Sequence, residues 1–161
     1  MRSLFPALSL FLLLMPAVFA ARAGELQVED PWVRAGPPTA RVMAGYLTLH
    51  NHGETAREIV RVTSPAFARV EMHLSRIEDG MARMIPQDTL RIPAGGKLEL
   101  APGGYHLMLF EPAAPLQLDD EVELTLQAGD GATLSVSAVV RMPGEPNGDH
   151  SHHNHASHHQ H

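Results

Sequence analysis

The feature that most constrains the fold is a two-residue alternation of apolar and polar side chains late in the chain. Apolar residues occupy every second position in 122–126 and again in 134–140, and Gly129-Asp130-Gly131 separates the two runs. Because successive side chains on a strand point to opposite faces, each run predicts a strand with one buried face. The turn sequence between them predicts that segments 121–127 and 133–141 form a β-hairpin.

Eight further short segments have the composition of strands, with Gly- and Pro-containing turn sequences between many of them. They are residues 26–34, 42–51, 57–63, 69–75, 81–86, 90–92, 97–100 and 105–110. No convincing helical stretch follows the N-terminal leader, so we expect an all-β sandwich or barrel. The alternation does not fix the order of the strands. Trp32, the only tryptophan, is expected to anchor the core.

The first residues have the pattern of a secretory signal peptide. Met1-Arg2-Ser3 is a short positive region, residues 4–19 are mostly apolar, and small residues precede two candidate cleavage points, after Ala20 and after Ala23. The apolar run is short and soon followed by polar sequence, which argues against a membrane anchor. No cysteine follows it to carry a lipid. We therefore interpret residues 1–23 as a signal peptide and expect no membrane anchor after its cleavage.

Composition limits what the remaining chain does. Residues 24–142 are long enough for one domain with its own core. The formal net charge of the full 161-residue sequence is −6, and nucleic acid is not expected as a partner because phosphate binding needs a basic surface. The absence of cysteine excludes disulfides, blue-copper centres and dinuclear copper centres. No nucleophile elbow, phosphate loop or dinucleotide fingerprint is present, so an enzyme is not expected.

Two histidines and two methionines predict a site for a soft metal ion. They are His73, Met84, His106 and Met108. His106 and Met108 are two apart in a strand-like segment and therefore share a face, while Leu107 points the other way. Thioether sulfur and imidazole nitrogen together favour Cu(I) over zinc, magnesium or calcium. Methionine also forms no disulfide in an oxidising compartment.

A predicted hairpin explains how His73 and Met84 share one site. Glu78-Asp79-Gly80 is a turn signal that returns the following segment, with Met84, towards His73. Alternation in segment 69–75 places His73 on the polar face and Met72 on the apolar face. The opening of the site is expected at the loops around Gly80 and residues 102–104.

Two other histidines, His50 and His52, lie at the end of a predicted strand and in the turn that follows it. Surface or turn roles are favoured for both over metal binding.

The four predicted ligands resemble the motif of the periplasmic copper chaperones called PCu(A)C. In that family a histidine is followed by ten residues, methionine, twenty-one residues, histidine, one residue and methionine, and this chain matches without a gap. Residues 71–73, 78–81 and 102–109 are also similar, and the resemblance extends from about Val28 to Val140. It implies a cupredoxin-like Greek-key β-sandwich or barrel that binds one Cu(I).

The resemblance further implies a location and a partner. The protein is expected in the periplasm, where it would deliver copper to the copper centres of cytochrome c oxidase. The exchange partner is expected to be an oxidase subunit or another periplasmic copper chaperone. A copper buffer or detoxification protein without a dedicated acceptor would use the same ligands, and the sequence does not separate these two functions.

Residues 143–161 form a C-terminal tail of different composition. The linker at 143–149 is rich in Gly and Pro, and disorder is expected from there to the end. The tail carries seven histidines in an irregular pattern that argues against an affinity tag: His150, His152, His153, His155, His158, His159 and His161. Imidazole without thioether suits Cu(II), Ni(II) or Zn(II), so the tail is expected to bind Cu(II).

Truncation after Met142 should separate the two kinds of site. One equivalent of Cu(I) should remain bound, because the predicted thioether ligands lie upstream, while most Cu(II) binding should disappear. Cu(II) binding by the full chain should also weaken as the pH falls through about 6.5, where free histidines become protonated. Equilibrium dialysis with each oxidation state measures both quantities. Equal Cu(II) stoichiometry in the two chains would show that the tail has no such role.

Overall fold

The computed structural model describes residues 26–144, and the regular elements in this range are ten β-strands. They are β1 (Leu26–Arg34), β2 (Val42–Asn51), β3 (Arg57–Thr63), β4 (Phe67–Glu78), β5 (Met81–Pro86), β6 (Leu90–Ile92), β7 (Lys97–Leu100), β8 (Tyr105–Pro112), β9 (Glu121–Ala128) and β10 (Thr133–Arg141). The predicted all-β fold is confirmed. Within the described range, no helix is long and apolar enough to span a bilayer.

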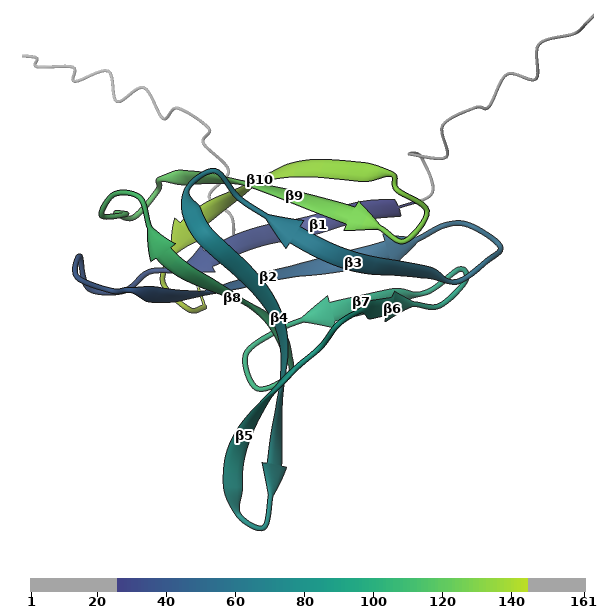
Figure 1. Cartoon of the computed structure of the whole chain (residues 1–161), viewed down its shortest axis with the longest axis horizontal. Coiled ribbons are helices and arrows are strands. Elements are labelled where there is room, and N and C mark those ends of the chain that lie inside the picture. Colours follow the sequence, from purple (N-terminus) through teal and green to yellow (C-terminus); the bar gives the residue numbers. More distant parts are fainter. Residues whose placement is uncertain (1–25, 145–161) are drawn as a thin grey trace, which may run out of the picture.

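The strands are neighbours in the order β5-β4-β8-β7-β2-β1-β10-β9-β3-β6, and β8 also pairs with β2. Most pairs are antiparallel, while β1 with β10 and β7 with β8 are parallel. The sheet curls so that β9 and β10 lie above β2 and β8 in Figure 1. This curvature lets side chains from distant strands enclose one core.

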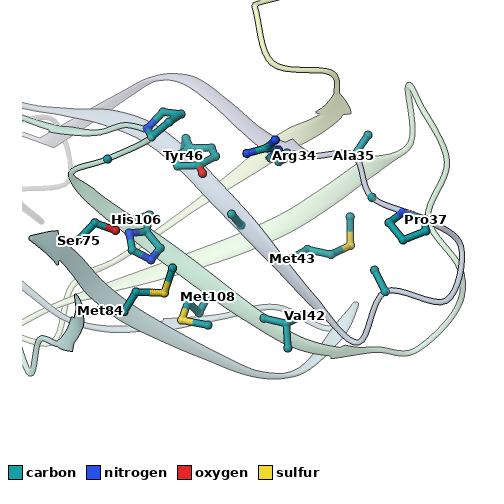
Figure 2. A pocket seen from close by; sticks show the side chains of 15 residues that line it. Arg34, Ala35, Pro37, Val42, Met43, Tyr46, Ser75, Met84, His106 and Met108 are labelled. Carbon is teal, nitrogen blue, oxygen red and sulfur yellow. The ribbon is translucent and has the colours of Figure 1, made fainter. Parts of the chain in front are cut away.

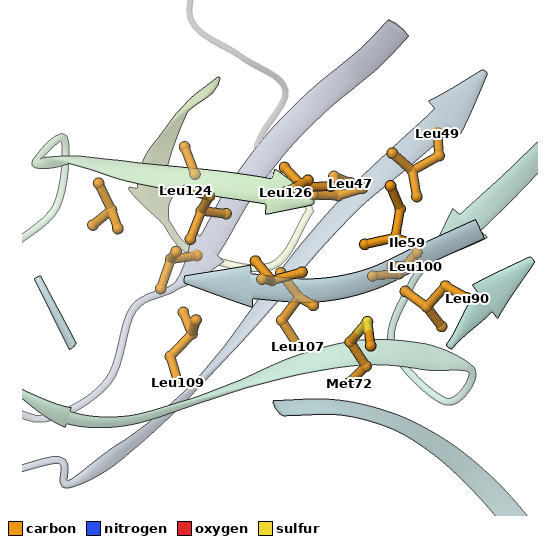
Figure 3. Close-up of a cluster of buried hydrophobic side chains, with 14 of the residues drawn as sticks. Leu47, Leu49, Ile59, Met72, Leu90, Leu100, Leu107, Leu109, Leu124 and Leu126 are labelled. Atoms are coloured by element: carbon orange, nitrogen blue, oxygen red, sulfur yellow. The ribbon is translucent and has the colours of Figure 1, made fainter. Parts of the chain in front are cut away.

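Leucine, isoleucine and valine side chains from most of the strands form that core (Figure 3). Leu107 and Leu109 of β8 are fully buried, as are Leu124 of β9 and Val140 of β10. These residues occupy the alternate positions that the sequence pattern assigns to the inner face. The residues that alternate with Leu107 and Leu109 on β8 therefore point away from the core, and His106 and Met108 are among them.

Strand β4 is longer than predicted, and its extra length has a physical cause. The predicted segment 69–75 ends where β4 leaves the main sheet, but residues 76–78 go on pairing with β5. Asp79 and Gly80 close the hairpin with positive φ angles of 52° and 77°, as a two-residue type I′ turn requires. Figure 1 shows the β4–β5 hairpin projecting from the body of the domain.

The prediction that Trp32 anchors the core is wrong. Trp32 is half-buried and lies outside the core cluster, where Val33 takes the inner position. Its ring packs on Tyr46 of β2, with centroids 4.6 Å apart, and the Arg141 guanidinium lies 4.9 Å from the Trp32 centroid. The register shifts between Glu29 and Trp32, so alternation counted straight through this strand misplaces the indole.

Candidate metal centre

The pairing of β4 with β8 and with β5 brings the four predicted ligands onto one face of the sheet. His73 lies directly opposite His106 across β4 and β8, and their ring centroids are 6.0 Å apart. Glu71 lies opposite Met108 on the same strands, and Met84 of β5 lies opposite Ser75 of β4. Residues directly opposite each other in an antiparallel pair share a face. The ligand face is the one turned away from the core.

His73 is on the predicted face but is not a surface residue. It is 7% exposed, and His106 is 5% exposed, so both imidazoles are buried on the outer side of the sheet. Loop residues lie beside His106: Pro102 and Gly103 line the same pocket, together with Ala35 and Pro37 of the β1–β2 connection. Sequence alternation assigns a face but does not show what covers it.

A backbone carbonyl fixes the tautomer of His106. Nδ1 of His106 lies 3.0 Å from the carbonyl oxygen of Gly104, and because that oxygen only accepts, Nδ1 carries the proton. The same carbonyl also accepts a hydrogen bond from the Ser75 backbone N–H at 3.0 Å. Nε2 of His106 is buried without a hydrogen-bond partner and presents its lone pair.

A carboxylate does the same for His73 through the other ring nitrogen. Nε2 of His73 donates to Oε2 of Glu71 at 2.9 Å, which leaves Nδ1 of the neutral ring with the lone pair. This Nδ1 is also buried and without a partner. In residues 26–144, these two imidazole nitrogens are the buried side-chain nitrogen or oxygen atoms that lack a hydrogen bond. An unmet buried polar atom costs about 1–3 kcal/mol, so a ligand for them is expected.

The two thioethers lie next to His106. Met84, His106 and Met108 line a pocket of about 600 Å³, together with Ser75. Figure 2 shows the sulfur atoms of Met84 and Met108 beside the His106 ring. Met84 is 61% exposed, whereas Met108 is half-buried. His73 does not line this pocket and lies at the neighbouring position across the β4–β8 ladder.

The donor set limits which metal this face suits. Among the residues that the structure describes, no three His, Cys, Asp or Glu side chains are grouped closely enough to hold a metal ion. A site here has to combine the two imidazoles with thioethers, and that combination is selective for a soft ion such as Cu(I).

Other predicted features have distinct positions. His50 bonds to Glu29 at 2.7 Å and His52 to Gln27 at 3.1 Å, and neither lines the pocket. Gly80 lies at the hairpin tip and is also absent from the pocket lining, so only the 102–104 loop of the two expected openings adjoins it. The tail histidines, His150 to His161, lie outside the described residues.

Sequence reasoning missed Glu71 and the Gly104 carbonyl as hydrogen-bond partners of the two imidazoles. For Glu71 a signal was available, because a residue two positions before His73 on a strand shares its face. The Gly104 carbonyl gave no such signal, since loop geometry determines where it points.

Known proteins resemble the chain over most of this domain. The family model "Putative lipoprotein LpqE-like" matches residues 26–140. "Putative lipoprotein Lxx21020" of Leifsonia xyli subsp. xyli is 33% identical over 121 residues, which cover 74% of this chain and 72% of the relative.

Two solved structures of copper-bound proteins are also similar. The Cu(I) form of DR1885 from Deinococcus radiodurans is 34% identical, has a TM-score of 0.58, and the match covers 81% of this chain and 89% of DR1885. The copper-bound PCuAC domain of PmoF2 has a TM-score of 0.63 at 22% identity, covering 74% of this chain and 95% of that domain. At that identity the second likeness shows the fold alone.

These comparisons confirm the resemblance read from the ligand spacing. The domain has the cupredoxin-like fold of the PCuAC domains. The chain belongs to the LpqE-like family.

Replacing His106 by leucine should not lower the stability of the metal-free protein. The change removes the unpaired Nε2, and the Gly104 carbonyl keeps its bond from Ser75 N–H. Leu107→Ala, one residue away but fully buried in the core, should cost about 2–5 kcal/mol. Urea unfolding in the presence of a copper chelator measures both free energies. A loss for His106→Leu as large as that for Leu107→Ala would show that His106 is a structural residue.

Proposed function

We propose that this chain is a periplasmic copper chaperone that binds one Cu(I) through His73, Met84, His106 and Met108. It delivers that copper to the copper centres of cytochrome c oxidase. The observation that carries the proposal is the pair of buried, unpartnered imidazole nitrogens on adjacent strands, with two thioethers beside His106. The similarity of this chain to the Cu(I) form of DR1885, at 34% identity, supports the choice of metal.

The unequal burial of the four side chains suits transfer rather than permanent storage. The imidazoles are at most 7% exposed and are oriented by hydrogen bonds, so they form the fixed part of the site. Met84 is exposed and comes from the projecting hairpin. A partner's ligand approaches the copper most readily from that side, and replacement of the Met84 thioether begins the exchange.

The proposal also includes the location of the protein and the role of its C-terminal tail. Residues 1–23 direct export to the periplasm, and residues 143–161 provide a separate Cu(II)-binding segment. The family and the Leifsonia relative are named as lipoproteins, and that description applies to those proteins. No catalytic step is assigned to this chain: its role is the binding and transfer of copper.

The double variant Met84→Leu/Met108→Leu should keep the fold and lose Cu(I). Leucine preserves apolar volume but removes both sulfur ligands, so Cu(I) affinity should fall by about 100-fold or more. Competition with a chromophoric Cu(I) chelator measures the affinity, and circular dichroism checks the fold. Met81→Leu/Met142→Leu is the matched control, because it removes two exposed thioethers outside the pocket. Unchanged affinity in the first variant would refute the ligand assignment.

Mixing experiments distinguish a chaperone from a copper buffer. The Cu(I)-loaded protein is incubated with the soluble copper-binding domain of cytochrome c oxidase subunit II, the two are separated, and copper is measured in each. A chaperone should lose most of its copper to that domain. The transfer should also be faster than the release of Cu(I) from the same protein to a chelator. Transfer no faster than dissociation would favour the buffer.

A further inference from the structure

Three neighbouring residue pairs across β4 and β8 extend the ligand face beyond the four ligands. His73 is opposite His106, Glu71 is opposite Met108, and Arg69 is opposite Phe110. Because Arg69, Glu71 and His73 are each two residues apart on one strand, all three side chains lie on the same face. Arg69 and Glu71 therefore lie on the same face of β4 as His73, which is one of the four proposed ligands.

Two hydrogen bonds link these residues, and the Glu71 carboxylate accepts both of them. Arg69 Nε donates to Oε1 of Glu71 at 2.8 Å, and Oε2 of the same carboxylate accepts the His73 bond at 2.9 Å. The Arg69 guanidinium carbon lies 4.2 Å from the centroid of the Phe110 ring. This cation–π contact helps to hold the guanidinium in place. Each oxygen of Glu71 thus has its own partner, and the carboxylate is held in one orientation.

The environment of His73 differs from that of His106. His106 donates to a neutral carbonyl, whereas His73 donates to a carboxylate. A hydrogen-bonded carboxylate makes an imidazole a stronger donor to a metal and fixes which nitrogen is available. The positive charge of Arg69 opposes this effect for two reasons. Arg69 partly neutralises the Glu71 carboxylate that strengthens His73, and it repels a bound cation.

We propose that Glu71 and Arg69 are a positioning pair that acts on copper through His73. Glu71 selects the tautomer in which Nδ1 is free and strengthens His73 as a ligand. Arg69 holds Glu71 in place and limits the affinity for the cation, which keeps release possible. The inference rests on the proposed function in one respect, namely that His73 is a copper ligand.

The first test needs no copper. Nitrogen–proton correlation spectra of the metal-free full chain report the tautomer of the His73 ring. The wild type and Glu71→Gln should show the proton on Nε2, since glutamine keeps an acceptor oxygen, and Glu71→Leu should show a mixture of tautomers. Glu78→Leu is the control, because Glu78 is a β4 carboxylate paired with Arg76 and Arg83 rather than a histidine. The same pure tautomer in Glu71→Leu as in the wild type would overturn the assignment.

The second test uses the sign of the change in Cu(I) affinity. Glu71→Gln should lower the affinity about tenfold, in the range seen when partners of metal ligands are removed. Arg69→Gln should raise it, and Arg69→Lys, which keeps the charge, should stay within about twofold of the wild type. General damage to the structure would lower the affinity in all three variants. Shifts of the same sign in Glu71→Gln and Arg69→Gln, or no shift in either, would overturn the proposal.

A further variant separates this inference from the proposed function. If His73→Leu binds Cu(I) as tightly as the wild type, the ligand assignment fails and the predicted effect of the pair on affinity fails with it. If His73→Leu loses Cu(I) but the Glu71 and Arg69 variants behave like the wild type, only the positioning pair is refuted.

Discussion

The register between β4 and β8 is the constraint on which the rest of the site depends. A slip of one residue would turn every side chain of a strand to the opposite face. A slip of β4 would turn His73 into the core and Met72 out of it, and a slip of β8 would do the same to His106 and Leu107. Both apolar side chains are buried, and Leu107 is fully so. Core packing thus fixes the position of the imidazoles, although none of the four proposed ligands belongs to the core cluster.

The sequence was most informative where alternation is regular. Seven of the ten strands have the predicted bounds, because turn residues mark their ends and apolar residues mark their inner faces. The ligand face was also predictable, since residues two apart on β8 have to share it. Trp32 shows the limit of this reasoning. A register shift inside β1 changes the face of the indole. Pro31 is typical of an edge strand or a bulge, but it does not show which face the residues after it take.

The finer features of the site arise from contacts between distant segments. Burial of His73 depends on the fold around it, and the tautomer of His106 depends on a carbonyl in the 101–104 turn. Ser75 and His106 come from different strands and meet at that same carbonyl. Such convergence has no periodic signature, so the residue types of the site could be predicted from the sequence while their hydrogen bonds could not.

The projecting hairpin divides the site into a part within the main sheet and a part at its edge. Within the described residues β5 is an edge strand whose neighbour is β4 alone, and all but one of its side chains are exposed. Bending of the hairpin would carry the Met84 thioether away without disturbing the apolar contacts of Leu107 or the hydrogen bonds of the two imidazoles. If Met84 is a ligand as proposed, the number of protein donors around a bound ion would change while the domain stays folded. The imidazoles lie where β4 pairs with β8, and Met84 lies where β4 and β5 extend beyond that pairing.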